Sequence, residues 1–200
     1  MSDPLWPYRT PGIPDDAFDR IPGIPLSQRE MRVLMIGQLR LKSQSCVWDI
    51  GAGTGTIAVE AALQCPEGIV YAVERDEEVV ELIQRNSRKF GADNVRVIQG
   101  TAPDCLRDIP QAPDRICFEG GTPIGAIVEE CWALLRSQGR LIATASSLDA
   151  LYVLSESFAK VQARQMEIVQ SAINRLEMRG ARQILAALDP IFILSGAKLD

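Results

Sequence analysis

Apolar and polar positions follow a repeating order along the chain that predicts strands and helices in alternation. Short continuous apolar runs, typical of buried strands, are each followed by a longer segment with apolar residues at helical spacing. The predicted strands cover 46–50, 69–74, 95–99, 114–118 and 139–145. The predicted helices that follow them cover 55–64, 76–90, 103–107, 123–136 and 148–160. This alternation predicts an α/β fold with a Rossmann-like, mostly parallel sheet.

The C-terminal part of the chain breaks this alternation. Residues 166–173 and 183–195 both have the composition of strands, and no helical pattern lies between them. We therefore expect the parallel sheet to close in an antiparallel hairpin.

The N-terminal part of the chain is rich in proline, which fixes φ and removes an amide donor. Residues 1–26 are therefore not expected to form regular helix or sheet. A flexible leader is one interpretation. The interleaved Trp6, Tyr8, Ile13 and Phe18 favour another, in which residues 1–26 form an arm packed on a domain of residues 27–200.

A helix is predicted to begin directly after this arm. Ser27 and Glu30 have the spacing of a capping box, with the serine at the N-cap and the glutamate at the third helical position. Met31, Met35 and Leu39 then recur on one helical face.

A candidate ligand site follows the first predicted strand, where Gly51, Gly53 and Gly55 stand at alternate positions. Glycine accepts positive φ and lets a ligand approach the backbone, and the first-turn N–H groups of a helix have no intrahelical partner. The dinucleotide fingerprint requires glycine where Thr56 stands, so this turn departs from the pyrophosphate-binding pattern. Glu74 ends the second strand, where an acid can accept hydrogen bonds from a ribose.

Composition narrows the class of function. The chain is 46% hydrophobic, and its net charge of −5 offers no basic field for a nucleic acid. Five cysteines without a C-x-x-C pair predict reduced, mostly buried thiols and a cytoplasmic location. Neither a signal peptide nor a membrane span is predicted. The absence of histidine excludes histidine base chemistry, and no spacing of Cys, Asp or Glu predicts a metal site.

The glycine-rich segment resembles the first motif of the class I S-adenosylmethionine-dependent methyltransferases, acid-x-Gly-x-Gly-x-Gly. Asp49, Gly51, Gly53 and Gly55 match it at every position, and Glu74 adds the expected acid after the second strand. The resemblance implies S-adenosyl-L-methionine as cofactor and a seven-stranded sheet whose last strand is antiparallel. An NAD-binding oxidoreductase, or a nucleotide-binding module without chemistry, is the alternative. Thr56 and the terminal hairpin disfavour the oxidoreductase.

Four longer segments resemble one family, the decarboxylating precorrin-6Y C5,15-methyltransferases in their precorrin-8W decarboxylase portion. These segments are 11–18, 23–32, 48–55 and 189–196. The resemblance implies methylation of C15 of a (cobalt-)precorrin and loss of the ring C acetate carboxyl group, in cobalamin biosynthesis. It also implies a homotetramer and a separate C5-methylating partner. The alternative is a class I methyltransferase for RNA, protein or another small molecule, which predicts a basic groove or an added domain.

The resemblance also implies which residues contact the cofactor. Carried over by position, they are Ser27, Gly51, Ala52, Gly53, Thr54, Gly55, Glu74, Thr101 and Ala102. Thr101 departs from the pattern, since related enzymes commonly have an aspartate there to bind the adenine amine.

Residues after the fourth strand are candidates for the substrate side of the site. Glu119 is the candidate for proton transfer, with a surface or helix-capping acid as the alternative. Gly120 and Gly121 line the substrate or serve only the turn before Pro123. Methyl transfer to a macrocycle carbon requires mainly alignment, and the conjugated macrocycle can accept the electrons left by CO₂.

A precorrin carries many carboxylates, which arginine binds in a bidentate manner. Arg175, Arg179 and Arg182 are expected to bind them as a group in a loop between the last two strands. Single candidates elsewhere are Arg9, Arg20, Arg29 and Arg32.

Overall fold

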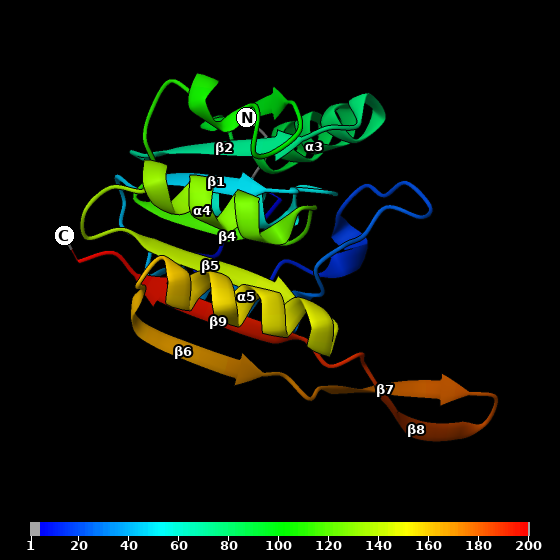
Figure 1. The fold of residues 1–200 in the computed structure, drawn as a ribbon. Helices are drawn as coiled ribbons and strands as arrows, with labels where there is room; N and C mark the ends of the chain where they lie inside the picture. Colours follow the sequence, from blue (N-terminus) through cyan, green and yellow to red (C-terminus); the bar gives the residue numbers. More distant parts are fainter. Residues whose placement is uncertain (1–4, 200) are drawn as a thin grey trace.

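The computed structural model describes residues 5–199, and across this range seven strands form one sheet in the order β3-β2-β1-β4-β5-β9-β6 (Figure 1). The strands are β1 (Cys46–Ile50), β2 (Ile69–Glu74), β3 (Val95–Gln99), β4 (Arg115–Phe118), β5 (Arg140–Ala145), β6 (Arg164–Gln170) and β9 (Phe192–Ala197). The first five pair in parallel, and β9 lies antiparallel between β5 and β6. The predicted α/β fold, with its antiparallel C-terminal strand, is confirmed.

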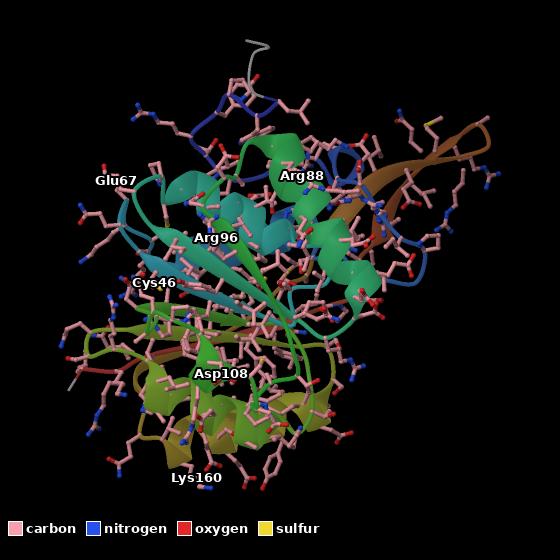
Figure 2. The ribbon with its side chains drawn as sticks, turned by 90° about the horizontal axis from the view of Figure 1, so that it is seen from above. Cys46, Glu67, Arg88, Arg96, Asp108 and Lys160 are labelled. Atoms are coloured by element: carbon pink, nitrogen blue, oxygen red, sulfur yellow. The ribbon has the colours of Figure 1, made fainter. Side chains whose placement is uncertain are left out.

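Helices cover both faces of this sheet. They are α1 (Arg29–Leu39), α2 (Thr56–Gln64), α3 (Glu77–Phe90), α4 (Ile124–Leu134) and α5 (Leu148–Lys160), with single 3₁₀ turns at η1 (Asp15–Ala17) and η2 (Leu106–Asp108). The first three helices share one buried core, and α4 and α5 share the other. Figure 2 shows the two layers from above, with Arg88 of α3 and Lys160 of α5 on opposite sides.

The C-terminal strands differ from the prediction of one hairpin. Between β6 and β9 the chain forms β7 (Asn174–Arg179) and β8 (Arg182–Ala187), which pair only with each other and project from the body (Figure 1). The segment 175–182 is therefore most of β7, a turn at 180–181 and the first residue of β8, and the expected loop is wrong. The alternation of charged and apolar residues over 175–179 was the available signal for a strand.

The N-terminal arm packs along the body of the molecule. Ile13 and Phe18 are buried, and the Phe18 ring centroid lies 4.7 Å from that of Phe90 on α3. Burial of these side chains provides the apolar contact that holds a segment with little regular structure. Residues 1–4 of the expected arm lie outside the described residues, and the division at residue 26 stays a prediction.

The predicted capping box at the start of α1 is wrong. Gln28 occupies the N-cap, and its carbonyl accepts from the backbone N–H of Arg32 at 2.9 Å. Asp15 of the arm caps the helix instead, because its Oδ1 accepts from the backbone N–H of Arg29 at 2.9 Å. The Ser27 hydroxyl has a tertiary partner, Glu119, and so is not used as a cap.

The described residues also bear on the cysteines and on membrane spans. All five cysteines are free, and Cys105 is half-buried while the other four are buried, which confirms the predicted thiols. The cytoplasmic location stays a prediction. Within residues 5–199, no helix combines the length and the apolar character needed to cross a membrane.

Candidate functional site

The glycine-rich turn between β1 and α2 holds a backbone conformation that only glycine accepts at low cost. Gly51 has φ +75°, and a Cβ there would lie 2.6 Å from the carbonyl oxygen of Gly120. Gly55 has φ +79° at the N-cap of α2, where a Cβ would lie 2.9 Å from the Ile83 side chain. The backbone N–H groups of Gly51 and Ala52 both donate to the Val73 carbonyl, at 3.0 and 3.1 Å. The turn is thus fixed against the ends of β2 and β4.

Glu74 lies across this turn, as expected for the acid that ends β2. Its Oε2 accepts from the backbone N–H of Gly53 at 3.1 Å, and its Oε1 accepts from Arg75 and Asp76. The backbone N–H of Gly100 donates to the Glu74 carbonyl at 2.9 Å. The following Thr101 and Ala102 are therefore brought beside Glu74 by the pairing of β2 with β3.

The N-terminal arm crosses the same turn. The Thr54 hydroxyl donates to the Pro25 carbonyl at 2.8 Å, and a Cβ on Gly53 would lie 3.3 Å from that carbonyl oxygen. Two residues later, the Ser27 hydroxyl donates to Oε2 of Glu119. The structure thus places Ser27 at the carboxyl edge of the sheet, and its contact with a cofactor stays a prediction.

Two carboxyl groups and a thiol converge at the ends of β1 and β4. Asp49 and Cys117 are register partners, and the ligand atoms of Asp49, Cys117 and Glu119 all lie within 4.8 Å of one another. Asp49 is fully buried, and neither of its oxygens has a hydrogen-bond partner among the described residues. Burial, with the neighbouring Glu119 and Glu74 carboxyl groups, raises the pKa of Asp49 well above its usual range.

Glu119 lies beside Asp49 and is half-buried. Burial raises the pKa of Glu119 from 4.5 to about 7. The Ser27 hydroxyl and the positive charge of Arg32 each act in the opposite direction and lower this pKa. Two like charges at this separation in a low-dielectric site are unfavourable, so one proton is retained by the Asp49–Glu119 pair near neutral pH. The predicted absence of a metal stays a prediction, because residues that could ligate one come together from separate strands.

Gly120 and Gly121 form the turn that leads from β4 into α4. Gly121 has φ +135°, and Gly120 lies against the turn at Gly51. Pro123 occupies the N-cap of α4 and not the expected first helical position. Both glycines are exposed beside Glu119, so the turn and the substrate-lining interpretations stay open.

The three hairpin arginines do not gather at one point. Arg175 forms ion pairs with Asp15 and Glu30, and this hydrogen bonding raises its pKa above the usual range. Arg179 and Arg182 lie exposed at the far end of the hairpin, where Arg179 is 3.7 Å from Glu177 of its own strand. The expectation that they bind carboxylates as one group in a loop therefore lacks the required geometry.

Arg32 was also expected to bind substrate carboxylates, but the structure places it in the interior. Its side chain is fully buried and forms ion pairs with Glu60 and Asp15, both at 2.7 Å. Glu60 is itself buried on α2, and the sequence analysis did not single it out. An acid within the otherwise apolar segment 57–62 was the only available signal.

The fold and the site together define the class of protein. A mostly parallel sheet with an inserted antiparallel strand, a glycine-rich turn after β1 and an acid at the end of β2 are the features of the class I methyltransferases. Residues 18–198 match the model of the precorrin methyltransferase domain, so the chain belongs to the precorrin methyltransferase family.

Relatives of known description agree over nearly the full chain. The chain is 36% identical over 192 residues, 95% of its length and 97% of the relative, to a probable cobalt-precorrin-6B C(15)-methyltransferase (decarboxylating) of Pyrobaculum calidifontis. A solved precorrin-6y C5,15-methyltransferase of Geobacter metallireducens matches with TM-score 0.87 and 28% identity, covering 94% and 98% of the two chains. A precorrin 8W decarboxylase of Methanobacterium thermoautotrophicum matches with TM-score 0.84 and 26% identity, covering 92% and 98%.

The raised pKa of Glu119 predicts a pH dependence of stability. The native state keeps this proton up to about pH 7, whereas the unfolded chain releases it near its ordinary value. The folded state therefore loses stability as pH rises from about 4.5 to 7. We expect Glu119→Gln to remove this loss, on the order of 1 kcal/mol for a partly exposed group, in denaturant unfolding at pH 5 and pH 8.

Glu67→Gln is the control for this measurement, because it removes an exposed carboxyl group at the opposite end of the sheet (Figure 2). An equal change in unfolding free energy between pH 5 and pH 8 for the wild-type protein and Glu119→Gln would contradict the assignment of the proton to the Asp49–Glu119 pair.

Proposed function

We propose that this protein transfers a methyl group from S-adenosyl-L-methionine to C15 of a (cobalt-)precorrin and removes the carboxyl group of the ring C acetate, in cobalamin biosynthesis. Family membership supports the chemistry, and the relatives are described by the same reaction. The observation that carries the proposal is the meeting of the Asp49 and Glu119 carboxyl groups at the carboxyl edge of the sheet, where burial raises the pKa of Glu119 to about 7 and so lets it hold a proton. Decarboxylation needs such a proton, whereas methyl transfer alone does not.

The residues present fit the proposed cofactor. The Gly51–Gly55 turn has positive φ at its three glycines, where close contacts with Gly120, Pro25 and Ile83 leave little room for a Cβ. This tight turn leads into the N-terminus of α2, whose first N–H groups lack helical partners. Glu74 reaches over this turn with a carboxylate that can bind a ribose diol, and Thr101 and Ala102 lie beside it for the adenine. When bound, S-adenosyl-L-methionine supplies the methyl group as an electrophile. The contacts proposed for it are Ser27, Gly51, Ala52, Gly53, Thr54, Gly55, Glu74, Thr101 and Ala102.

The protein's own residues contribute orientation, exclusion of water and one proton transfer. In the decarboxylation the bond between the acetate methylene carbon and its carboxyl carbon breaks, and CO₂ leaves. The electron pair passes into the conjugated macrocycle and is then used to bind a proton at the methylene carbon, which becomes a methyl group. Protonated Glu119 gives this proton and is left as a carboxylate, which takes a proton again from solvent.

The cofactor proposal predicts the effect of removing the Glu74 carboxylate. We expect Glu74→Ala to weaken S-adenosylhomocysteine binding by about tenfold or more, since a hydrogen bond to a charged group contributes on the order of 1.5–3 kcal/mol. Titration calorimetry measures this, with the exposed acid variant Glu77→Ala as control. Tighter binding of NAD than of S-adenosylhomocysteine would contradict the methyltransferase assignment and favour the oxidoreductase.

The reaction is tested by mass spectrometry of the product formed from labelled S-adenosyl-L-methionine and a C5-methylated precorrin. We expect the gain of one methyl group with the loss of one CO₂. Glu119→Gln is expected to keep methylation and to slow decarboxylation by about 10²–10⁴-fold, the usual contribution of a general acid. In the wild-type protein, decarboxylation is expected to fall as pH rises through about 7, because the acid form is then lost.

Methylation without decarboxylation by the wild-type protein would place the second step elsewhere. No reaction despite cofactor binding would favour the alternative, a class I methyltransferase for RNA, protein or another small molecule. The net charge of −5 supports the precorrin over a nucleic acid.

We also propose that the protein assembles as a homotetramer through the β7–β8 hairpin. One face of the hairpin carries Leu176, Met178 and Leu185, each more than 60% exposed, and Leu176 pairs directly with Leu185. Such apolar faces are rare on soluble monomers and mark contact sites. A separate protein is proposed for C5 methylation, because the described residues form one seven-stranded sheet, besides the β7–β8 hairpin, with one glycine-rich turn of this kind.

Assembly is tested by light scattering. We expect wild-type protein at four times the chain mass of 22.0 kDa, and a smaller species for Leu176→Lys/Leu185→Lys, because charges on this face oppose its burial. Leu148→Lys is the control, since this leucine is 73% exposed on another element, α5. A monomeric wild-type protein would contradict the proposal.

A further inference from the structure

Arg32 is a buried charge that joins the arm to the body of the molecule. Its Nε is 2.7 Å from Oε1 of Glu60, and one terminal nitrogen is 2.7 Å from Oδ1 of Asp15. The other terminal nitrogen donates to the Ile13 carbonyl, and the guanidinium carbon lies 5.1 Å from the centroid of the Phe18 ring. A buried charge is tolerated only when it is paired, and all three nitrogens of this guanidinium donate hydrogen bonds.

The same guanidinium reaches Ser27. The terminal nitrogen that bonds Asp15 also donates to the Ser27 carbonyl, while the Ser27 hydroxyl donates to Glu119. Ser27 is therefore held from both sides, through its backbone by Arg32 and through its side chain by the proposed acid. Ser27 stands outside α1, so no helical hydrogen bond of its own fixes it there.

The partners of Arg32 are themselves fixed. Glu60 on α2 also accepts from the backbone N–H groups of Gly12 and Ile13, at 2.7 and 3.1 Å. Asp15 is held on its second oxygen by Arg175 of the hairpin at 2.8 Å. Arg32 is thus anchored to α2, to the arm and through Asp15 to β7, and it has little freedom to move.

We propose that Arg32 is a positioning residue that holds the Ser27 hydroxyl on Glu119 and so orients the acid for its proton transfer. The inference rests on the proposed function, because it takes Glu119 as the group that gives the proton. Arg32 acts through Ser27 and does not itself contact substrate or cofactor.

Two opposing effects set the pKa of Glu119. Burial raises the pKa of Glu119, and the Ser27 hydroxyl, which donates to the carboxylate form, lowers it again. The other titratable or charged groups around it are Asp49 on β1, Cys117 on β4 and Arg32 on α1. Loss of the serine contact therefore shifts the titration of Glu119 to higher pH, even when the charge at residue 32 is kept.

Arg32→Lys tests this, because it keeps the positive charge and removes the planar fork that reaches Ser27. Carbon-13 NMR of labelled glutamate side chains follows the titration of Glu119, assigned by its loss in Glu119→Gln. We expect Arg32→Lys and Ser27→Ala each to raise the Glu119 midpoint by about one pH unit. The double variant is expected to equal Ser27→Ala, because the two residues act in one path.

Arg140→Lys is the matched control. Arg140 is also buried, but it contacts Gln38 and Ser195 and makes no contact with the Ser27–Glu119 pair. The Arg140→Lys variant should have a lower free energy of unfolding without any change in the Glu119 titration. Asp15→Asn, which removes a single partner of Arg32, is expected to move the midpoint in the same direction by less and replaces Arg32→Lys if that variant does not fold.

An unchanged midpoint in Arg32→Lys, or shifts that add in the double variant, would overturn the proposal and leave Arg32 a purely structural residue. The NMR readout does not depend on catalysis. If the midpoint shifts while the wild-type protein releases no CO₂, the positioning stands and the proposed function fails. If CO₂ release occurs and its pH profile is unmoved in Arg32→Lys, the positioning fails alone.

Discussion

The parallel pairing of β1 with β4 is the constraint on which the site depends. This register sets Asp49 beside Cys117. The residues that follow the two strands then form the facing turns at Gly51 and Gly120. Two neighbouring parallel strands deliver their carboxyl ends to one edge, so an acid from each arrives in the same buried space. The absence of a Cβ at Gly51 allows the two backbones to approach closely enough for this.

Burial of these acids creates a group that can hold a proton near neutral pH. An isolated carboxyl group in water would be ionised there, and the change comes from the loss of solvent and from the second carboxyl group nearby. The Ser27 hydroxyl acts in the opposite direction and keeps Glu119 within a range useful for proton transfer. The chemistry therefore depends on Ser27, which directly follows the arm, a segment with little regular structure.

The arm is held at that place by charges as well as by apolar contacts. Arg32, Glu60 and Asp15 form a buried network whose separate members would each be costly to bury alone. Asp15 also caps α1 and contacts Arg175, so the first helix, the arm and the hairpin share one carboxylate. The hairpin proposed for assembly is therefore connected to the site through Asp15.

The sequence by itself determined the order of strands and helices, the glycine-rich turn and the acid at Glu74, because hydrophobic periodicity and backbone conformation are local properties. The antiparallel last strand also followed from the missing helix near the C-terminus. Only the tertiary structure decided which polar side chains meet. Ser27 has the spacing of a helix cap, yet its hydroxyl finds a partner in Glu119 after β4. Arg32 has the spacing of a surface cation, yet the arm and α2 supply its partners. Asp49 and Glu119 are brought together by strand pairing across the sheet, and their burial, which local sequence does not encode, gives them their proton.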